Sequence, residues 1–294
     1  MSKLVQFKTL QIRQSIGVVS GDELMDIGAL AENAPKSMLE WLRLAEAERM
    51  RLIQLASTSG KRIPLQDIEF LPAVTGSEKV ICLGLNYADH AAEGGNARPD
   101  YPSFFLRSPG SLVGHGCAIL LPHVSTKLDF EAELAVVIGQ RSRYLTDENA
   151  LQAVAGYACF NDATLRDYQR RSSQWTIGKN FDNTGAFGPF LVEARDLPAG
   201  AAGLKIESRL NGAVMQSSNT SNMLFPVAET LRLITEVMTL EVGDVVVMGT
   251  PAGVGYARTP PIWMQPGDSV VVEIEGIGVL TNPIEQDTRK PGQV

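Results

Sequence analysis

The chain has 294 residues, which is long enough for one large domain with a small addition, and its hydrophobic share of 44% excludes wholesale disorder. The formal net charge is −7, and the sequence has no stripe of basic residues. We therefore expect neither nucleic acid nor an anionic membrane as a partner. No apolar stretch approaches the ~20 residues that span a bilayer.

The N-terminal residues and the cysteines indicate which cellular compartment to expect. The N-terminus alternates polar and apolar residues and lacks the apolar block of a signal peptide. The three cysteines, Cys82, Cys117 and Cys159, are odd in number and far apart, which excludes a disulfide framework and a Cys-x-x-Cys zinc site. We therefore expect a reducing, cytoplasmic setting.

Residues 1–73 are predicted to form a small N-terminal α/β domain. Ser20-Gly21-Asp22 is a turn sequence between apolar runs, which predicts a hairpin. The segment contains no histidine and no acid cluster, so we assign it a structural role. Its predicted elements are strands over 4–10, 16–27 and 67–72 and one helix over 37–56 with apolar residues at helical spacing.

Residues 74–286 are predicted to form the main domain, and residues 287–294 a loose polar tail. Short β-rich runs separated by Gly, Pro and Asn turns dominate, and they do not alternate regularly with helices. This pattern favours a mixed, mostly antiparallel α+β domain over a doubly wound parallel sheet. The predicted elements are strands over 80–85, 118–121, 130–139, 156–161, 204–210, 244–249 and 269–274 and helices over 147–155 and 226–239.

Acidic residues alternate along one predicted strand. Asp129, Glu131 and Glu133 precede the apolar run that ends at Gly139, and side chains two apart on a strand share a face. Like charges this close cost stability unless something neutralises them, and oxygen ligands suit Mg²⁺, Mn²⁺ or Ca²⁺. A strand whose acidic face meets solvent would show the same pattern, and the spacing by itself leaves both interpretations open.

A third oxygen donor, Asp162, ends the next predicted strand. An acid at the end of a strand that opens into a loop is a common place for a functional group. Asp162 could equally cap the N-terminus of a following helical turn. If it does bind metal, then Glu131, Glu133 and Asp162 provide three carboxylates and leave positions free for water or substrate.

A short helix is predicted between Asn86 and the Gly94-Gly95 pair. His90 and Glu93 stand three residues apart on it, within reach of each other, and a carboxylate bonded to imidazole is the arrangement of a general base. The glycine pair suggests a hinged lid. An ordinary surface pair has the same spacing. His115 and His123 lie in loop-like positions and are interpreted as structural.

Six motifs occur in the order that is found in one family. They resemble the fumarylacetoacetate hydrolase superfamily, and especially its smaller prokaryotic-type members that act on acylpyruvates and other 2-oxo acids. The match extends over residues 80–284. The motifs are G-L-N-Y-A-D-H-A-A-E, P-S-F-F-L-R-S-P, L-D-F-E-A-E-L-A-V-V-I-G, N-D-A-T-L-R-D-Y-Q, W-T-I-G-K-N-F-D and V-V-M-G-T-P-A-G-V-G.

The resemblance implies a mixed β-roll catalytic domain, a homodimer, and one Mg²⁺ or Mn²⁺ per subunit on Glu131, Glu133 and Asp162. It also implies a His90–Glu93 lid dyad. Many members carry lysine where this chain has Arg107, and arginine keeps the charge but cannot donate a proton, which favours carboxylate binding there. The remaining implied residues are the catalytic Lys179 and the substrate-binding Arg166, Gln169 and Thr250.

The expected reaction is the hydrolysis of a carbon–carbon bond in an acylpyruvate-type 2,4-dioxo acid, such as fumarylpyruvate or a 2,4-dioxo sugar acid. His90, oriented by Glu93, would deprotonate the attacking water, and Lys179 with Gln169 would steady the developing anion. The same site would serve an oxaloacetate decarboxylase or tautomerase, or an isomerase or hydratase of a 2-oxo acid. A non-catalytic metal-dependent binding protein ranks third. Residues 252–265, which include Arg258, are expected to border the substrate.

Overall fold

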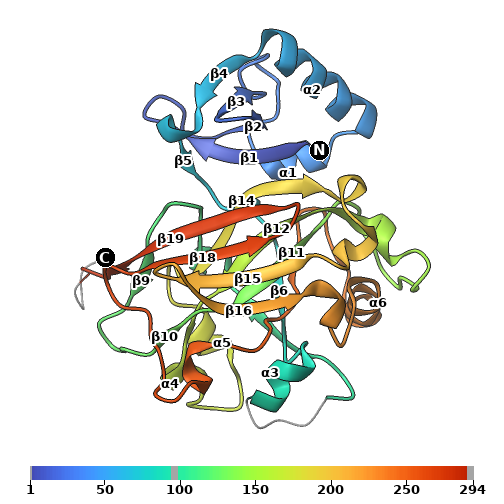
Figure 1. The fold of residues 1–294 in the computed structure, drawn as a ribbon. Coiled ribbons are helices and arrows are strands. Elements are labelled where there is room, and N and C mark those ends of the chain that lie inside the picture. The colour runs from blue at the N-terminus through green and yellow to red at the C-terminus, as the bar shows by residue number, and fades with distance from the viewer. Residues whose placement is uncertain (1, 94–98, 290–294) are drawn as a thin grey trace.

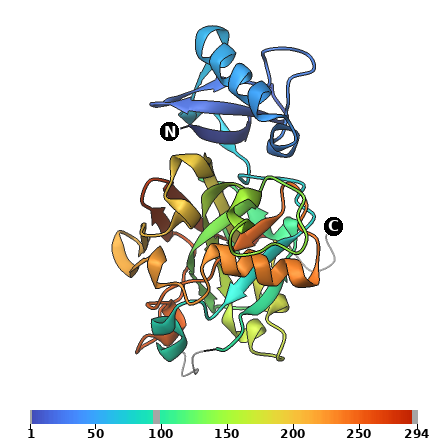
Figure 2. The same ribbon diagram turned by 90° about the vertical axis from the view of Figure 1, so that its right-hand side faces the viewer.

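The structure, a computed structural model, describes residues 2–93 and 99–289. Figures 1 and 2 both show the N-terminal strands and helices gathered at one end of the molecule. Figure 1 places three short helices, α3 (Ala88–Glu93), α4 (Arg166–Gln169) and α5 (Thr176–Lys179), at the opposite end. The predicted glycine pair at 94–95 and most of the predicted tail lie outside the described residues.

A twelve-stranded sheet runs through both halves of the chain. Its order is β4-β3-β2-β1-β14-β12-β11-β17-β6-β7, with β5 beside β1 and β8 beside β14. Most neighbouring strands are antiparallel; β14–β8 and β17–β6 are parallel. The strands are β1 (Lys3–Lys8), β2 (Ser15–Ser20), β3 (Glu23–Asp26), β4 (Lys61–Pro64), β5 (Glu69–Phe70), β6 (Val80–Gly84), β7 (Ser103–Arg107), β8 (Leu112–Val113), β11 (Ala132–Ile138), β12 (Val154–Asp162), β14 (Gly185–Glu193) and β17 (Val245–Val247).

A second sheet of five strands lies against the first, in the order β16-β15-β18-β19-β9. A two-stranded ladder joins β10 to β13 beside the acidic segment. This mixed, mostly antiparallel arrangement confirms the predicted α+β class. The bounds are β9 (Ile119–Leu121), β10 (Leu128–Asp129), β13 (Thr164–Leu165), β15 (Lys205–Leu210), β16 (Ala213–Asn219), β18 (Ser269–Ile274) and β19 (Gly278–Gln286).

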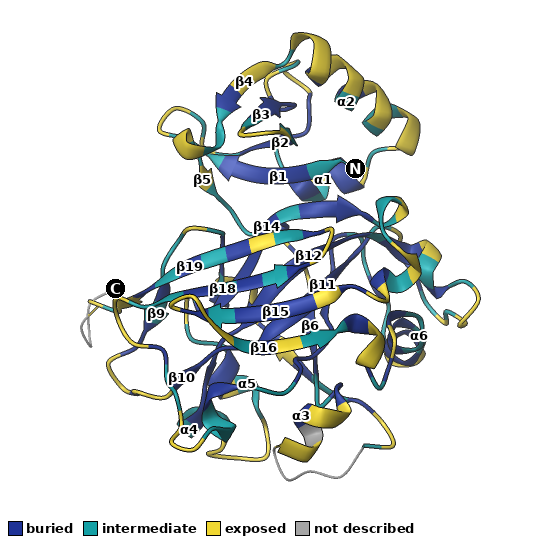
Figure 3. Ribbon diagram, viewed as in Figure 1, coloured by how far each residue is buried: buried dark blue, intermediate teal, exposed yellow. Residues whose placement is uncertain are grey.

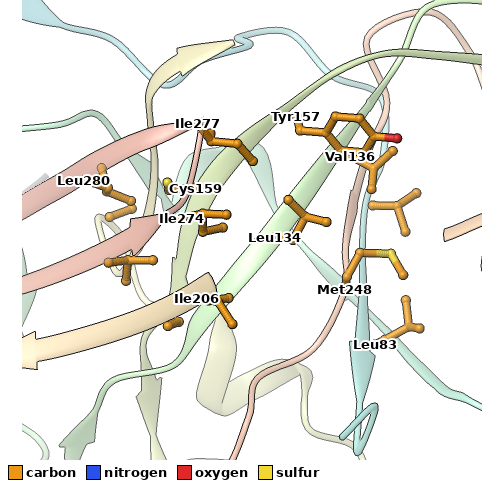
Figure 4. Close-up of a cluster of buried hydrophobic side chains, with 14 of the residues drawn as sticks. Leu83, Leu134, Val136, Tyr157, Cys159, Ile206, Met248, Ile274, Ile277 and Leu280 are labelled. Atoms are coloured by element: carbon orange, nitrogen blue, oxygen red, sulfur yellow. The ribbon is translucent and has the colours of Figure 1, made fainter. Parts of the chain in front are cut away.

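The central strands are buried on both faces. Every residue of β11 is buried, and Figure 3 shows buried residues concentrated in the middle of the sheets. Leu134 and Val136 pack with Cys159, Ile206 and Ile274 between the two sheets (Figure 4). Alternate residues Ala135 and Val137 face the other way, into a core that includes Trp41 of α1 (Met38–Leu42). This double burial explains the uninterrupted apolar run, since neither face needs polar side chains.

The N-terminal predictions were right about the hairpin but wrong about the helix. β2 and β3 pair on either side of Gly21. The single helix predicted over 37–56 is instead α1 followed by α2 (Glu46–Ser59), and β4 was missed. The strand pair β1–β14 connects these residues to the main sheet. The assignment of residues 1–73 to a separate domain stays a prediction.

In the main part of the chain, one predicted helix is wrong and several strands were missed. Residues 147–155 form only a 3₁₀ turn over Ala150–Ala153, because the chain extends at Val154 to pair β12 with Ile138 of β11. The helix predicted over 226–239 is present as α6 (Val227–Val237). β14 was missed because its Gly188-Pro189 pair is typical of a turn; the ladder with β12 shifts register there. The edge strands β7 and β16 and the strand β19 were also missed.

Candidate active site and metal centre

Three carboxylates meet at the end of the central strands. Glu131, Glu133 and Asp162 each offer an oxygen within 4.8 Å of the others, and all three side chains are buried. The burial excludes the interpretation of a solvent-facing acidic strand. Asp162 does not cap a helix either, because α4 begins after Leu165 and has no side-chain cap. The two sequence segments, 31 positions apart, come together because β11 and β12 are antiparallel neighbours.

Strand register decides which acids converge. Glu133 lies opposite Phe160 across the β11–β12 ladder, and the Asp162 N–H donates to the Glu131 carbonyl oxygen at 3.0 Å. Glu133 and Asp162 therefore share the face of the sheet that carries Ala135 and Val137 farther along. The carboxylates of Glu133 and Asp162 thus lie at the end of this otherwise apolar face.

Asp129 does not join the triad, although strand periodicity places it on the same face. The chain leaves the β conformation between β10 and β11, and the Asp129 carboxylate turns to the loop after β17. It accepts the N–H groups of Gly255 at 2.7 Å and Tyr256 at 3.1 Å, and the Nε–H of Arg166 at 2.8 Å. Asp129 thus anchors one wall of the site.

Buried cations neutralise two of the three carboxylates. The Lys179 ammonium donates to Glu131 Oε2 and to Asp162 Oδ2, both at 2.5 Å. Arg166 donates to Glu131 Oε1 at 2.6 Å and Arg107 to Asp162 Oδ1 at 2.5 Å. Burial tends to raise the pKa of Glu131, but Arg166 and Lys179 outweigh it and hold that pKa at about 2. The pKa of Lys179 is raised, since Asp162 and Glu131 overcome the effect of burial, so the ammonium is a fixed positive charge.

Glu133 differs from the other two carboxylates in having no cationic partner in the described part of the chain, and it therefore tests whether a metal cation fits the site. Its Oε2 accepts the Gly249 N–H at 2.6 Å, but among the described residues no cationic side chain lies within ion-pair distance of its carboxylate. Burial, and then the charges of Asp162 and Glu131, raise its pKa well above the usual value. Three buried oxygen donors with one uncompensated charge fit a hard divalent cation such as Mg²⁺ or Mn²⁺.

Gly249 can donate to Glu133 only because its backbone is free of a side chain. Its φ is +87°, a left-handed conformation that favours glycine, and a Cβ there would lie 2.7 Å from Asn86 Cβ. Asn86 in turn was predicted to open the helix of the dyad, but α3 begins at Ala88. The Asn86 amide instead donates to the carbonyl oxygens of Met248 and Phe225, which holds the start of α3 against the end of β17.

The helix α3 brings the dyad to the carboxylates. His90 is only 6% exposed, and its Nδ1 lies 3.5 Å from Glu93 Oε2. Both Glu93 oxygens also accept the Gly253 N–H, at 3.0 and 3.1 Å. Burial tends to raise the pKa of Glu93, but the hydrogen bonds from His90 and Gly253 lower it overall. Glu93 therefore ties the helix to the loop after β17 as well as orienting His90.

One cavity of about 410 Å³ joins these parts. Of the residues expected to act, it is lined by His90, Glu131, Glu133, Arg166, Gln169, Lys179 and Thr250. Arg107, Asp162 and Glu93 are absent from the lining. The Arg107 side chain is fully buried, is paired with Asp162 and also donates to Thr184 Oγ1 at 2.8 Å, so substrate binding by Arg107 stays a prediction.

Among the lining residues that sequence reasoning did not single out are Arg170 and Tyr256. Tyr256 belongs to the 252–265 loop that was expected to border the substrate, and its ring contacts the guanidinium groups of both Arg166 and Arg170. Arg258 in the same loop donates to the backbone carbonyls of Gly253 and Met215 and does not line the cavity. His115 accepts the Thr281 N–H and His123 is exposed, both away from the cavity.

Known proteins combine the same elements. Residues 79–285 match the family described as fumarylacetoacetate hydrolase, C-terminal. An oxaloacetate tautomerase from Bos taurus mitochondria, FAHD2A, is 39% identical over 96% of this chain and 91% of its own length. The fumarylacetoacetate hydrolase of Exiguobacterium antarcticum superposes with a TM-score of 0.83 at 34% identity, covering 97% of this chain and 100% of that one.

A third relative was solved with ligands. The maleylpyruvate hydrolase of Sphingobium sp. SYK-6, in complex with manganese(II) and pyruvate, has a TM-score of 0.79 and 28% identity over 97% of this chain and 99% of that chain. The β-rich fold, with three buried carboxylates clustered beside one cavity, is that of a family of enzymes. This chain belongs to the fumarylacetoacetate hydrolase family, as its motifs indicated. Within the described residues, no helix is long and apolar enough to cross a membrane.

Proposed function

We propose that this protein is a divalent-metal-dependent enzyme that tautomerises 2-oxo acids, with oxaloacetate as its first candidate substrate. The observation that carries the proposal is one cavity lined by Glu131, Glu133, Lys179 and His90, with Asp162 clustered with the two glutamates beside it. Similarity to an oxaloacetate tautomerase over 96% of the chain supports this reaction over the hydrolysis that the motifs favoured.

In this proposal Glu131, Glu133 and Asp162 hold Mg²⁺ or Mn²⁺, and the bound cation supplies Lewis acidity at the oxygens of a 2-oxo acid. Lys179 adds a fixed positive charge on the same side of the cavity, where negative charge develops on the 2-oxo oxygen. Asp162 and Glu131 raise the pKa of Lys179 in the metal-free protein, and we assign Lys179 the role of a charge-stabilising ammonium ion.

His90 moves the proton. When Nδ1–H points to Glu93, the Nε2 lone pair is free to accept a proton from C3 of the 2-oxo acid. The C3–H electron pair then forms the C2–C3 double bond, the carbonyl π pair moves to the oxygen, and that oxygen takes a proton from solvent to give the enol, while His90 returns its proton to solvent. The reverse steps convert the enol to the ketone. Glu93 remains ionised throughout and stabilises the protonated imidazole.

Hydrolysis of an acylpyruvate is the second candidate. A base that can accept a proton from carbon can also accept one from water, and the structural relative named as a maleylpyruvate hydrolase supports this reaction class. Water would add to the carbonyl remote from the 2-oxo group, and the carbon–carbon bond would break. Its electron pair would stay on pyruvate C3, which then takes up a proton.

The test compares reactions on one protein preparation. The ultraviolet absorbance of enol-oxaloacetate reports tautomerisation, and pyruvate release from fumarylpyruvate, acetylpyruvate and oxaloacetate reports hydrolysis and decarboxylation. We expect the Mg²⁺-loaded protein to accelerate enol decay and His90→Ala to lower that rate by roughly 10²–10⁴-fold. His123→Ala, an exposed histidine outside the cavity, is the matched control and should retain full rate.

The outcomes separate the candidates. Faster release of pyruvate from an acylpyruvate with no effect on enol decay would replace tautomerisation by hydrolysis. A His90-independent reaction would remove the proton-transfer role, and turnover that persists in full after chelation would remove the metal. No reaction with any of these substrates, together with tight ligand binding, would favour a binding protein.

A further inference from the structure

Arg170 is a cation at the cavity wall that forms no ion pair with the described part of the protein. It follows α4 directly and lines the cavity, and its side chain is exposed. Neighbouring Arg166 is fully engaged, since it donates to Asp129, to Glu131 and to Gln169 Oε1 at 2.9 Å. Among the residues that the structure describes, no carboxylate lies within 4.0 Å of an Arg170 nitrogen.

Tyr256 holds the Arg170 guanidinium beside the cavity. The centre of its ring lies 4.5 Å from Cζ of Arg170 and 4.4 Å from Cζ of Arg166. The backbone N–H of Tyr256 is bound by Asp129, which also binds Arg166, so the ring and both guanidinium groups share one anchor. A stacked guanidinium keeps its edge free to bind a carboxylate with two parallel hydrogen bonds.

The formal charges of the site show what the charge of Arg170 contributes. At the site, four buried carboxylates meet three buried cations, so with all seven groups ionised the site carries one negative charge, and a divalent ion would make it one positive charge. A single substrate carboxylate balances that charge. Arg170 contributes a second positive charge, which matches a second carboxylate. The groups counted are Asp129, Glu131, Glu133 and Asp162 against Arg107, Arg166 and Lys179.

We propose that Arg170 binds the distal carboxylate of the substrate and thereby selects 2-oxo dicarboxylates over 2-oxo monocarboxylates. This inference rests on the proposed action on 2-oxo acids. It makes Arg170 a specificity-determining residue at the cavity wall, placed by Tyr256.

The experiment compares Arg170→Gln with Arg171→Gln. Arg171 is the next residue and carries the same charge, but its guanidinium lies 3.6 Å from the Tyr168 ring and does not line the cavity. The substrates are oxaloacetate and its 4-methyl ester, which differ in the distal charge. We expect Arg170→Gln to lower kcat/KM for oxaloacetate by roughly 10–100-fold, the usual loss of a charged hydrogen bond, and to change the ester by less than about threefold. Arg171→Gln should change neither, and Arg170→Lys should retain part of the preference.

Calorimetric binding of 2-oxoglutarate and 2-oxobutyrate to the Mg²⁺-loaded protein tests the subsite without any reaction. Tighter binding of 2-oxoglutarate that is lost in Arg170→Gln supports the subsite even if oxaloacetate is not tautomerised, in which case only the proposed reaction fails. Equal effects of Arg170→Gln on dicarboxylate and monocarboxylate, or the same effect from Arg171→Gln, would overturn the proposal.

Discussion

Replacing Arg107 with methionine should destabilise the metal-free protein strongly. The Arg107 and Asp162 side chains are both 0% exposed, and the pair is joined at 2.5 Å. The guanidinium also donates to Thr184 Oγ1 at 2.8 Å and to the Ala163 carbonyl oxygen at 3.2 Å. Methionine has a similar length but no donor, so Asp162 would lose one of its two cationic partners inside the protein.

The expected size follows from these contacts. Removal of one partner from a buried ion pair costs about 3–5 kcal/mol, because the remaining charge stays buried and uncompensated. Lys179 still contacts Asp162 Oδ2, which favours the lower end of that range, whereas the lost bond to Thr184 adds about 1 kcal/mol. We therefore expect a decrease of roughly 4 kcal/mol in the free energy of unfolding.

Urea unfolding in the presence of a chelator, followed by tryptophan fluorescence, measures this loss. Arg141→Met is the matched control, because the Arg141–Glu241 pair is at the surface and its arginine is 69% exposed, so about 0–1 kcal/mol is expected. Added Mg²⁺ should restore part of the stability of Arg107→Met, since the cation brings positive charge to Asp162. Equal losses in the two variants would refute the reasoning, and a large rise in KM with unchanged stability would return Arg107 to substrate binding.

Three further changes test the site. Mg²⁺ or Mn²⁺ should raise the Tm of the wild type and of the exposed-site control Glu148→Gln but not of Glu133→Gln; equal rises in all three would contradict the metal centre. The pKa of Glu93 is lowered, so its contact with Gly253 should be complete above the unfolded value near 4.5 and be lost as the pH falls through the lower folded value. Hydrogen exchange in α3 should therefore increase at acid pH in the wild type, and the same pH dependence in Glu93→Gln would argue against this. Gly84→Ala should displace Trp175 and weaken substrate binding, since the new Cβ would lie 2.0 Å from Trp175 Cζ3. The control Gly110→Ala, whose new Cβ would have its nearest atom at 3.7 Å, should change neither tryptophan fluorescence nor KM.

The sequence determined the features that depend on local periodicity or on motif order. Alternation of acids before an apolar run placed Glu131 and Glu133 on one strand face, and turn residues at Gly21 placed the β2–β3 hairpin. Helical spacing found α6, and six ordered motifs found the family. These features can be predicted from residues that are close in the sequence or from comparison with known motifs.

Tertiary structure decided everything that depends on partners far apart in the chain. Asp129 shares the predicted strand face of Glu131 and Glu133, but in the structure it pairs with Arg166, 37 positions away. Arg107, expected to contact substrate, pairs with Asp162, 55 positions away. Tyr256 and Arg170 carry no motif, and their shared stacking exists only because Asp129 draws the loop after β17 onto Arg166. The Gly188-Pro189 pair in β14 is typical of a turn. The segment is nevertheless a strand, because β12 and β1 pair with it on its two sides. Such contacts depend on sheet register, which no local pattern specifies.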